Sequence, residues 1–115
     1  MTKVVYNACF GGFSLSDAAM FRFAELKGIK IFKTSDGYFV DGTDEYFSNY
    51  DMNRTDPDLI RVIEEMGDKA NGLCAKLKIA EVPVGTLYRI DDYDGYECIM
   101  TQNDYDWKMA TLIRN

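Results

Sequence analysis

The segment 55–67, TDPDLIRVIEEMG, constrains the fold more than any other stretch of this 115-residue chain. It opens with a capping threonine, Thr55, then a proline in the first helical turn and two aspartates that favour the positive end of a helix dipole. Apolar residues then recur at the spacing of one helix face: Leu59, Val62, Ile63 and Met66. Because Gly67 ends this pattern, the sequence predicts a helix whose apolar stripe must be buried against another element.

A second helix is expected at 16–27. Its apolar residues share one face, and Gly28 stands where a helix would stop. Ser14 or Ser16 would cap the first turn, because a serine hydroxyl accepts a hydrogen bond from the free N–H groups there.

Strands are expected in the segments whose apolar residues alternate or run together: 3–8, 29–33, 38–40, 75–83, 86–90 and 97–100. The second and third form a hairpin around the turn Ser35-Asp36-Gly37. Residues 41–55 are expected to form a loop, with a short strand near Tyr46. Two helices and five to six short strands predict an α+β fold, with the helices packed on a mostly antiparallel sheet and the later strands in a meander.

The composition indicates one domain spanning 1–115, with 101–115 as a weakly patterned C-terminal segment. A hydrophobic content of 47% supports a packed core. No run approaches about 18 apolar residues and the first residues lack a signal-peptide pattern, so we expect a cytoplasmic protein without a membrane partner. A formal charge of −6 without a basic block argues against binding to bulk nucleic acid.

The chain contains no histidine, which removes Ser-His-Asp and Cys-His catalysis and every metal site that needs imidazole. Its three cysteines are odd in number and lack C-x-x-C spacing, so neither a four-thiolate zinc site nor a disulfide framework is expected. The acidic run 91–95 fails the EF-hand pattern, because Thr101 stands where the last acidic ligand belongs. Asp56 and Asp58 are better explained by helix capping, so no metal or cofactor is expected.

The stretch 4–16, VVYNACFGGFSLS, is the best candidate for a site, although no P-loop, dinucleotide or cysteine-phosphatase motif is present. In one interpretation, backbone N–H groups at the glycine pair hold an anion, serine hydroxyls assist, and aromatic rings stack a base. The ligand-binding residues predicted on this basis are Asn7, Cys9, Phe10, Gly11, Gly12, Phe13, Ser14, Ser16 and Arg54. In the other interpretation, Gly11 and Gly12 supply only a tight turn, and Phe10 and Phe13 belong to the core.

Two of these residues allow further alternatives. Cys9 lies just ahead of a helix start, where the pKa of a thiol can fall, so it is either a core residue or a nucleophilic or redox thiol. Arg54 is either a surface charge or a contact to a ligand anion.

Three long stretches carry specific patterns: VVYNACFGGFSLSDAA…FAELKG, RTDPDLIRVIEEMGDKANGLCAKLKIAEVP and YRIDDYDGYE. Together they resemble a family of small proteins encoded by tailed bacteriophages and prophages, over roughly residues 3–34 and 53–98. The ending of this chain, with Trp107, differs from the basic tail of that family. The resemblance implies a phage accessory protein acting in the host cytoplasm, and it brings no established activity with it.

Three classes of function follow, and a virion or assembly component is a fourth possibility for which the sequence holds no signal. The first is non-catalytic sequestration of a small anionic, nucleotide-type ligand, such as an immune signalling nucleotide. The second is an acidic protein–protein inhibitor of a host factor, since acidic residues gather at 41–58 and 91–97. The third is an enzyme using Cys9, which would need Asp, Glu, Lys or the substrate as its base. A homo-oligomer is expected, because small sequestering proteins often build their pockets between chains.

Overall fold

The computed structural model describes residues 1–43, 45–47 and 52–102. Over these residues the elements follow one another as β1 (Thr2–Asn7), α1 (Asp17–Leu26), β2 (Ile31–Thr34), β3 (Gly37–Val40), α2 (Pro57–Met66), the 3-10 helix η1 (Gly67–Ala70), β4 (Leu77–Val82), β5 (Tyr88–Tyr93) and β6 (Tyr96–Thr101). The short strand expected near Tyr46 is an isolated bridge to Phe39. Most of the weakly patterned C-terminal segment, including Trp107, lies outside the described residues.

The predicted α+β class is confirmed, and the described strands pair antiparallel. These strands form three two-stranded sheets, β1–β4, β2–β3 and β5–β6, where one larger sheet was expected. The later strands form only part of the expected meander: β5 and β6 pair as a hairpin, whereas β4 pairs with β1 and places Ile79 opposite Val5. Buried β1 needs partners for its backbone N–H and C=O groups, and β4 supplies them over Leu77–Val82.

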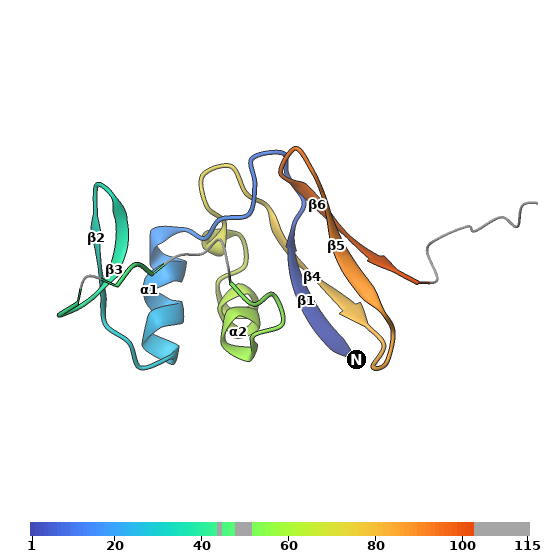
Figure 1. Ribbon diagram of the computed structural model, residues 1–115, viewed down its shortest axis with the longest axis horizontal. Helices are drawn as coiled ribbons and strands as arrows, with labels where there is room; N and C mark the ends of the chain where they lie inside the picture. Colours follow the sequence, from blue (N-terminus) through green and yellow to red (C-terminus); the bar gives the residue numbers. More distant parts are fainter. Residues whose placement is uncertain (44, 48–51, 103–115) are drawn as a thin grey trace, which may run out of the picture.

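Figure 1 shows the spatial order of the elements along the long axis: the β2–β3 hairpin at one end, then α1, α2, the β1–β4 pair and the β5–β6 hairpin. Strand β1 is therefore covered on both faces, by the helices on one side and by β5–β6 on the other. Val4 and Val5 point to opposite faces and are both fully buried. This double burial explains why the strand reads as a continuous apolar run.

Both predicted helices are present. Ser16 caps α1, and its Oγ accepts a hydrogen bond from the first turn of that helix at 3.2 Å. Asp56 caps α2 where Thr55 was expected, and its carboxylate accepts from the N–H of Asp58 at 2.8 Å. The cap lies one residue later because Pro57 occupies the first helical position and the residue before it becomes the cap.

The core lies between the two helices and the face of β1 and β4 that they cover. Its buried members are apolar: Val5, Leu15, Ala19, Met20, Phe23, Leu59, Val62, Ile63, Ala70 and Leu77. Most of them come from the apolar helix faces that the sequence predicts. Within the described ranges, neither helix has the length and apolar character needed to cross a bilayer.

Candidate functional site

The double-glycine bend between β1 and α1, Gly11–Gly12, packs against two other segments: the loop that carries Cys74 and the β5–β6 turn. A Cβ on Gly11 would lie 1.9 Å from the Cβ of Cys74, so a side chain cannot fit there. On the other side, a Cβ on Gly95 would lie 2.5 Å from the carbonyl oxygen of Phe10 and 2.7 Å from the nitrogen of Gly12. Backbone of the β5–β6 turn therefore covers Gly12, whose φ of +90° also favours glycine. This close packing leaves little room for a phosphate on that side of the bend.

Asn7 is fully buried and joins three segments. Its Nδ2 donates to the carbonyl oxygens of Cys9, at 2.7 Å, and Gly95, at 2.9 Å. Its Oδ1 accepts from the N–H of Lys76 at 2.8 Å. Both ends of this amide are engaged by backbone, so Asn7 positions the bend and the β5–β6 turn and does not present a polar group to a ligand.

Arg54 and Glu97 form a two-pronged ion pair with side-chain exposures of only 16% and 7%. The Nη1–Oε1 distance is 2.6 Å and the Nη2–Oε2 distance is 3.0 Å. The guanidinium carbon lies 3.6 Å from the centroid of the Phe13 ring, and Glu97 also accepts the N–H of Asn7 at 2.9 Å. The charge of Arg54 is thus already neutralised within the chain.

The same pair closes the second edge of β1. The N–H of Val5 donates to the carbonyl oxygen of Arg54 at 2.8 Å, and Nη1 of Arg54 reaches the carbonyl oxygen of Val5 at 3.4 Å. The N–H of Asn7, farther along this edge, donates to Glu97. An arginine and a glutamate therefore satisfy backbone groups that a neighbouring strand would otherwise bind.

The remaining predicted residues have mixed placements. Ser16 donates to the carbonyl oxygen of Lys69 at 2.7 Å in addition to capping α1. Ser14 lies against Gly72, where an added Cβ would be 1.9 Å from the serine Oγ. Cys9 is half-buried at the start of the bend. The structure brings Asn7, Phe13 and Arg54 together in one largely buried cluster, whereas Ser16 belongs to the helix cap.

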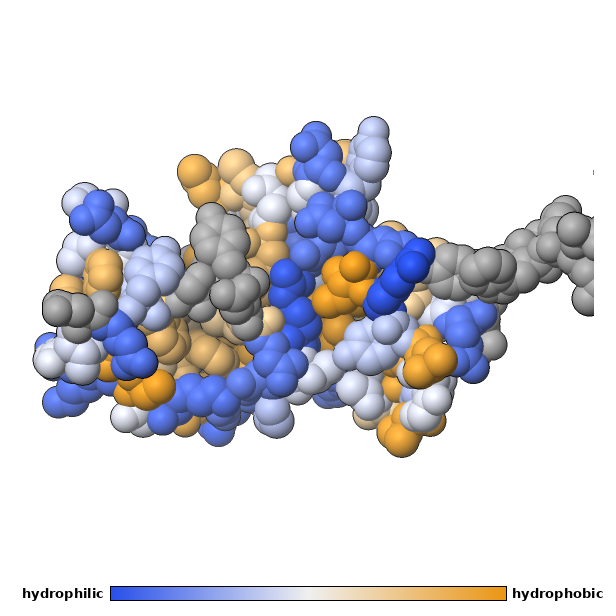
Figure 2. All heavy atoms as spheres, in the orientation of Figure 1, coloured by the Kyte–Doolittle hydropathy of each residue, from blue (hydrophilic) through white to orange (hydrophobic). Residues whose placement is uncertain are grey.

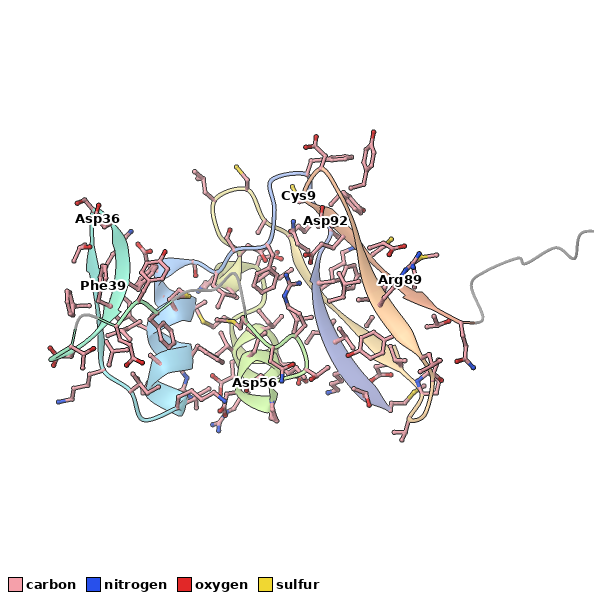
Figure 3. All side chains as sticks on the ribbon, viewed as in Figure 1. Cys9, Asp36, Phe39, Asp56, Arg89 and Asp92 are labelled. Carbon is pink, nitrogen blue, oxygen red and sulfur yellow. The ribbon has the colours of Figure 1, made fainter. Side chains whose placement is uncertain are left out.

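Among the predicted residues, Phe10 and Gly11 are exposed, and Phe10 has 61% of its area at the surface. Its ring centroid lies 5.1 Å from that of Tyr96, and the two rings are tilted by 54°. They line a groove of about 260 Å³, which we call the aromatic–acidic groove; its lining residues are Phe10, Asp91, Asp92, Tyr93, Tyr96 and Cys98. Figure 3 shows Cys9 and Asp92 at this end of the molecule, where β1 ends and β5 turns into β6.

Carboxylates give the groove its charge. Asp91 lies 2.7 Å from Nε of Arg89 in an exposed ion pair, with side-chain exposures of 39% and 64%. Asp92 accepts the N–H of Gly95 at 2.8 Å and thereby holds the tight turn, which continues through Asp94 at a φ of 52°. This end of the hairpin is negatively charged, because it carries Asp91, Asp92 and Asp94 but one arginine, Arg89.

Clear pKa shifts occur at the opposite end of the molecule. Hydrogen bonds from Lys33 and from Tyr38 lower the pKa of Asp17. Burial, followed by the hydrogen bond to Asp17, raises the pKa of Tyr38. At neutral pH the carboxyl of Asp17 is ionised and the phenol of Tyr38 is protonated. The contacts of Asp17 with Lys33 and Tyr38 join the β2–β3 hairpin to α1. Such an arrangement is a structural ion pair and offers no free base.

Comparisons with protein-family models, curated proteins and solved structures find no significant match. Across the described part of the chain, no three cysteine, aspartate or glutamate side chains are arranged to hold a metal ion.

Sequence reasoning missed Glu97 and Gly95, which complete the buried cluster. A signal for Glu97 was present, because an acidic residue within an apolar strand needs a partner when it is buried. The partner, Arg54, lies 43 residues away, and no local pattern links the two.

Proposed function

We propose that this protein acts by binding, without catalysis, and that its partner is a positively charged protein of a bacterial host. The aromatic–acidic groove carries this proposal. Exposed aromatic rings are typical of binding surfaces, and the neighbouring aspartates complement a basic partner. The resemblance to bacteriophage proteins supports a host factor in the cytoplasm as the target.

The charge of the chain favours a basic partner over an anionic one. The formal charge of the chain is −6, and Asp91, Asp92 and Asp94 lie at or beside the groove. Arg54, the cation expected to contact an anion, is occupied by Glu97. Figure 2 shows hydrophobic side chains beside strongly hydrophilic ones over the end of the molecule that carries β5 and β6.

Capture from a bacterial lysate tests this function. The tagged protein is expected to retain a basic protein in stoichiometric amount and to release it at high salt, because exposed charges are screened. A variant with Asp91→Asn and Tyr93→Ala should lose this partner. The matched control, Asp36→Asn with Phe32→Ala, alters the hairpin at the opposite end and should retain it. Equal capture by both variants, or no stoichiometric partner, would contradict the proposal.

A nucleotide-type ligand is the second candidate. The exposed ring of Phe10 supports it, because a base can stack there beside the glycine bend. Calorimetry with cyclic dinucleotides and ADP-ribose at millimolar concentration distinguishes the two functions. Binding heat that is seen with the wild type and lost in Phe10→Leu supports the nucleotide. If no compound gives binding heat, the nucleotide is ruled out. Light scattering in the same buffer tests the proposed homo-oligomer, which predicts a mass above the 13.2 kDa of one chain.

A further inference from the structure

We propose that the aromatic–acidic groove binds a single cationic side chain, an arginine or lysine presented by a basic segment of the partner protein. This inference rests on the proposed function and specifies the chemistry of recognition at the same surface. Three properties of the groove support it: its size, its aromatic rings and its carboxylates.

The size of the groove suits one side chain. Its volume is about 260 Å³. Pockets that enclose a complete small-molecule ligand usually measure roughly 300–1,000 Å³. The groove is also open along the outer end of the β5–β6 hairpin, where Tyr93 and Tyr96 stand opposite one another in the strand register. A segment of a second protein can therefore lie across this surface and place one side chain in the groove.

The aromatic rings supply faces for a cation. Phe10, Tyr93 and Tyr96 are 61%, 78% and 39% exposed, respectively, so their rings are accessible. Phe10 and Tyr96 are tilted by 54° and so form two walls of one corner. A guanidinium or ammonium within about 6 Å of such rings is attracted by their negative faces.

The neighbouring carboxylates favour a cation over a neutral side chain. The exposed lining of the groove is mostly apolar, but Asp91 and Asp92 are among its lining residues, so their negative charge lies close to any occupant and favours a cationic head group. Asp91 already accepts a guanidinium, that of Arg89, at 2.7 Å. An exposed ion pair contributes little to stability, so an incoming cation can share the carboxylate of Asp91 with Arg89.

A titration with short peptides tests this inference on the intact chain. The probe is the capped peptide Gly-Arg-Gly-Arg-Gly, and its control has citrulline, a neutral analogue of the same shape, in place of arginine. NMR shifts of the amides in β5 and β6 report binding. The arginine peptide should bind, and the citrulline peptide should bind at least about fivefold more weakly.

Variants assign the binding to the rings. Phe10→Leu and Tyr96→Leu keep apolar volume but remove a ring face, and each should weaken the arginine peptide about fivefold to tenfold. Phe10→Trp keeps the face and should bind at least as tightly as the wild type. Phe32→Leu removes an exposed ring of similar accessibility in β2 and should have no effect. The amide spectrum of each variant confirms that it is folded.

The outcomes separate this inference from the proposed function. Equal binding of the arginine peptide by the wild type, Phe10→Leu and Tyr96→Leu would overturn the inference, as would equal binding of the citrulline peptide. A host protein that is captured equally by the wild type and Phe10→Leu, but not by Asp91→Asn with Tyr93→Ala, would overturn it and leave the proposed function intact. Ring-dependent binding of the arginine peptide supports the inference even if no host protein is captured.

Discussion

Gly95 and Gly85 share a φ of +89°, but only Gly95 lies against other backbone. Both should lose stability on substitution by alanine, since that φ costs an ordinary residue about 1–2 kcal/mol. In Gly95→Ala the new Cβ would also meet Phe10 and Gly12 at less than 3 Å, so we expect at least about 2 kcal/mol of additional loss in the free energy of unfolding. Urea denaturation of the two variants measures the difference. Equal losses would show that the bend does not depend on this contact.

Arg54 and Glu97 are expected to be strongly coupled. Because the pair is largely buried, Arg54→Met or Glu97→Gln leaves one partner without its counter-charge and should cost about 3 kcal/mol. The double variant should cost about 1–3 kcal/mol less than the sum of the two single losses. A parallel cycle at the exposed pair Arg89–Asp91 should give a coupling energy below about 1 kcal/mol. Comparable coupling in the two cycles would contradict the structural role assigned to Arg54.

At the scale of elements, a cation joins the end of α1 to the start of α2. Nζ of Lys27, the C-cap of α1, lies 2.6 Å from Asp56 and 2.9 Å from Asp58. These hydrogen bonds, the one with Asp56 first, raise the pKa of Lys27. Burial raises the pKa of Asp56, but the hydrogen bond and charge of Lys27, together with hydrogen bonds from the backbone of Asp58 and Leu59, outweigh burial, and the net pKa is lowered from 3.8.

This contact should make the stability of the protein depend on pH. A carboxyl whose pKa is lowered by folding contributes stability above its unfolded pKa, near 3.8 for Asp56, and loses that contribution as the pH falls through the folded pKa. Lys27→Met should therefore cost about 1 kcal/mol at neutral pH and progressively less below about pH 4. Urea midpoints at about pH 7, 5 and 3 measure this, with Lys30→Met as the control. A cost that does not change with pH would contradict the assignment.

Elements were predictable from the sequence where their signals are local. The helix at α2 has its proline, its apolar stripe and its closing glycine within eleven residues, Pro57–Gly67, and it appears within a residue of the expected ends. The pairing of β1 with β4 was not predictable, because it joins residues 70 to 80 positions apart and other strands of the chain would match the same pattern. The buried cluster was predictable only in part for the same reason. Asn7 and Arg54 were predicted as site residues, but their partners, Gly95 and Glu97, are distant in the sequence.

At the scale of the whole molecule, the β5–β6 hairpin packs on one face of β1, and buried polar contacts hold it there. Glu97 receives hydrogen bonds from Asn7 and Arg54, and Gly95 from Asn7. Weakening these contacts should release the hairpin before the helical core unfolds. In Glu97→Gln, hydrogen exchange in β5 and β6 should therefore accelerate about tenfold or more, while that in α2 changes little. Uniform acceleration over all elements would show instead that the protein opens as one unit.

The buried cluster limits how this chain can evolve, because its contacts join Asn7, Arg54, Gly95 and Glu97. A replacement at any one of them leaves a buried charge without its partner, an amide without its hydrogen bonds or a steric clash. A compensating mutation would have to arise in a distant stretch of the gene. Drift at these four positions should thus be slow and correlated. Tyr93 and Phe10, on the outside of the same hairpin and bend, escape that restriction and are free to diversify under selection by whatever they touch.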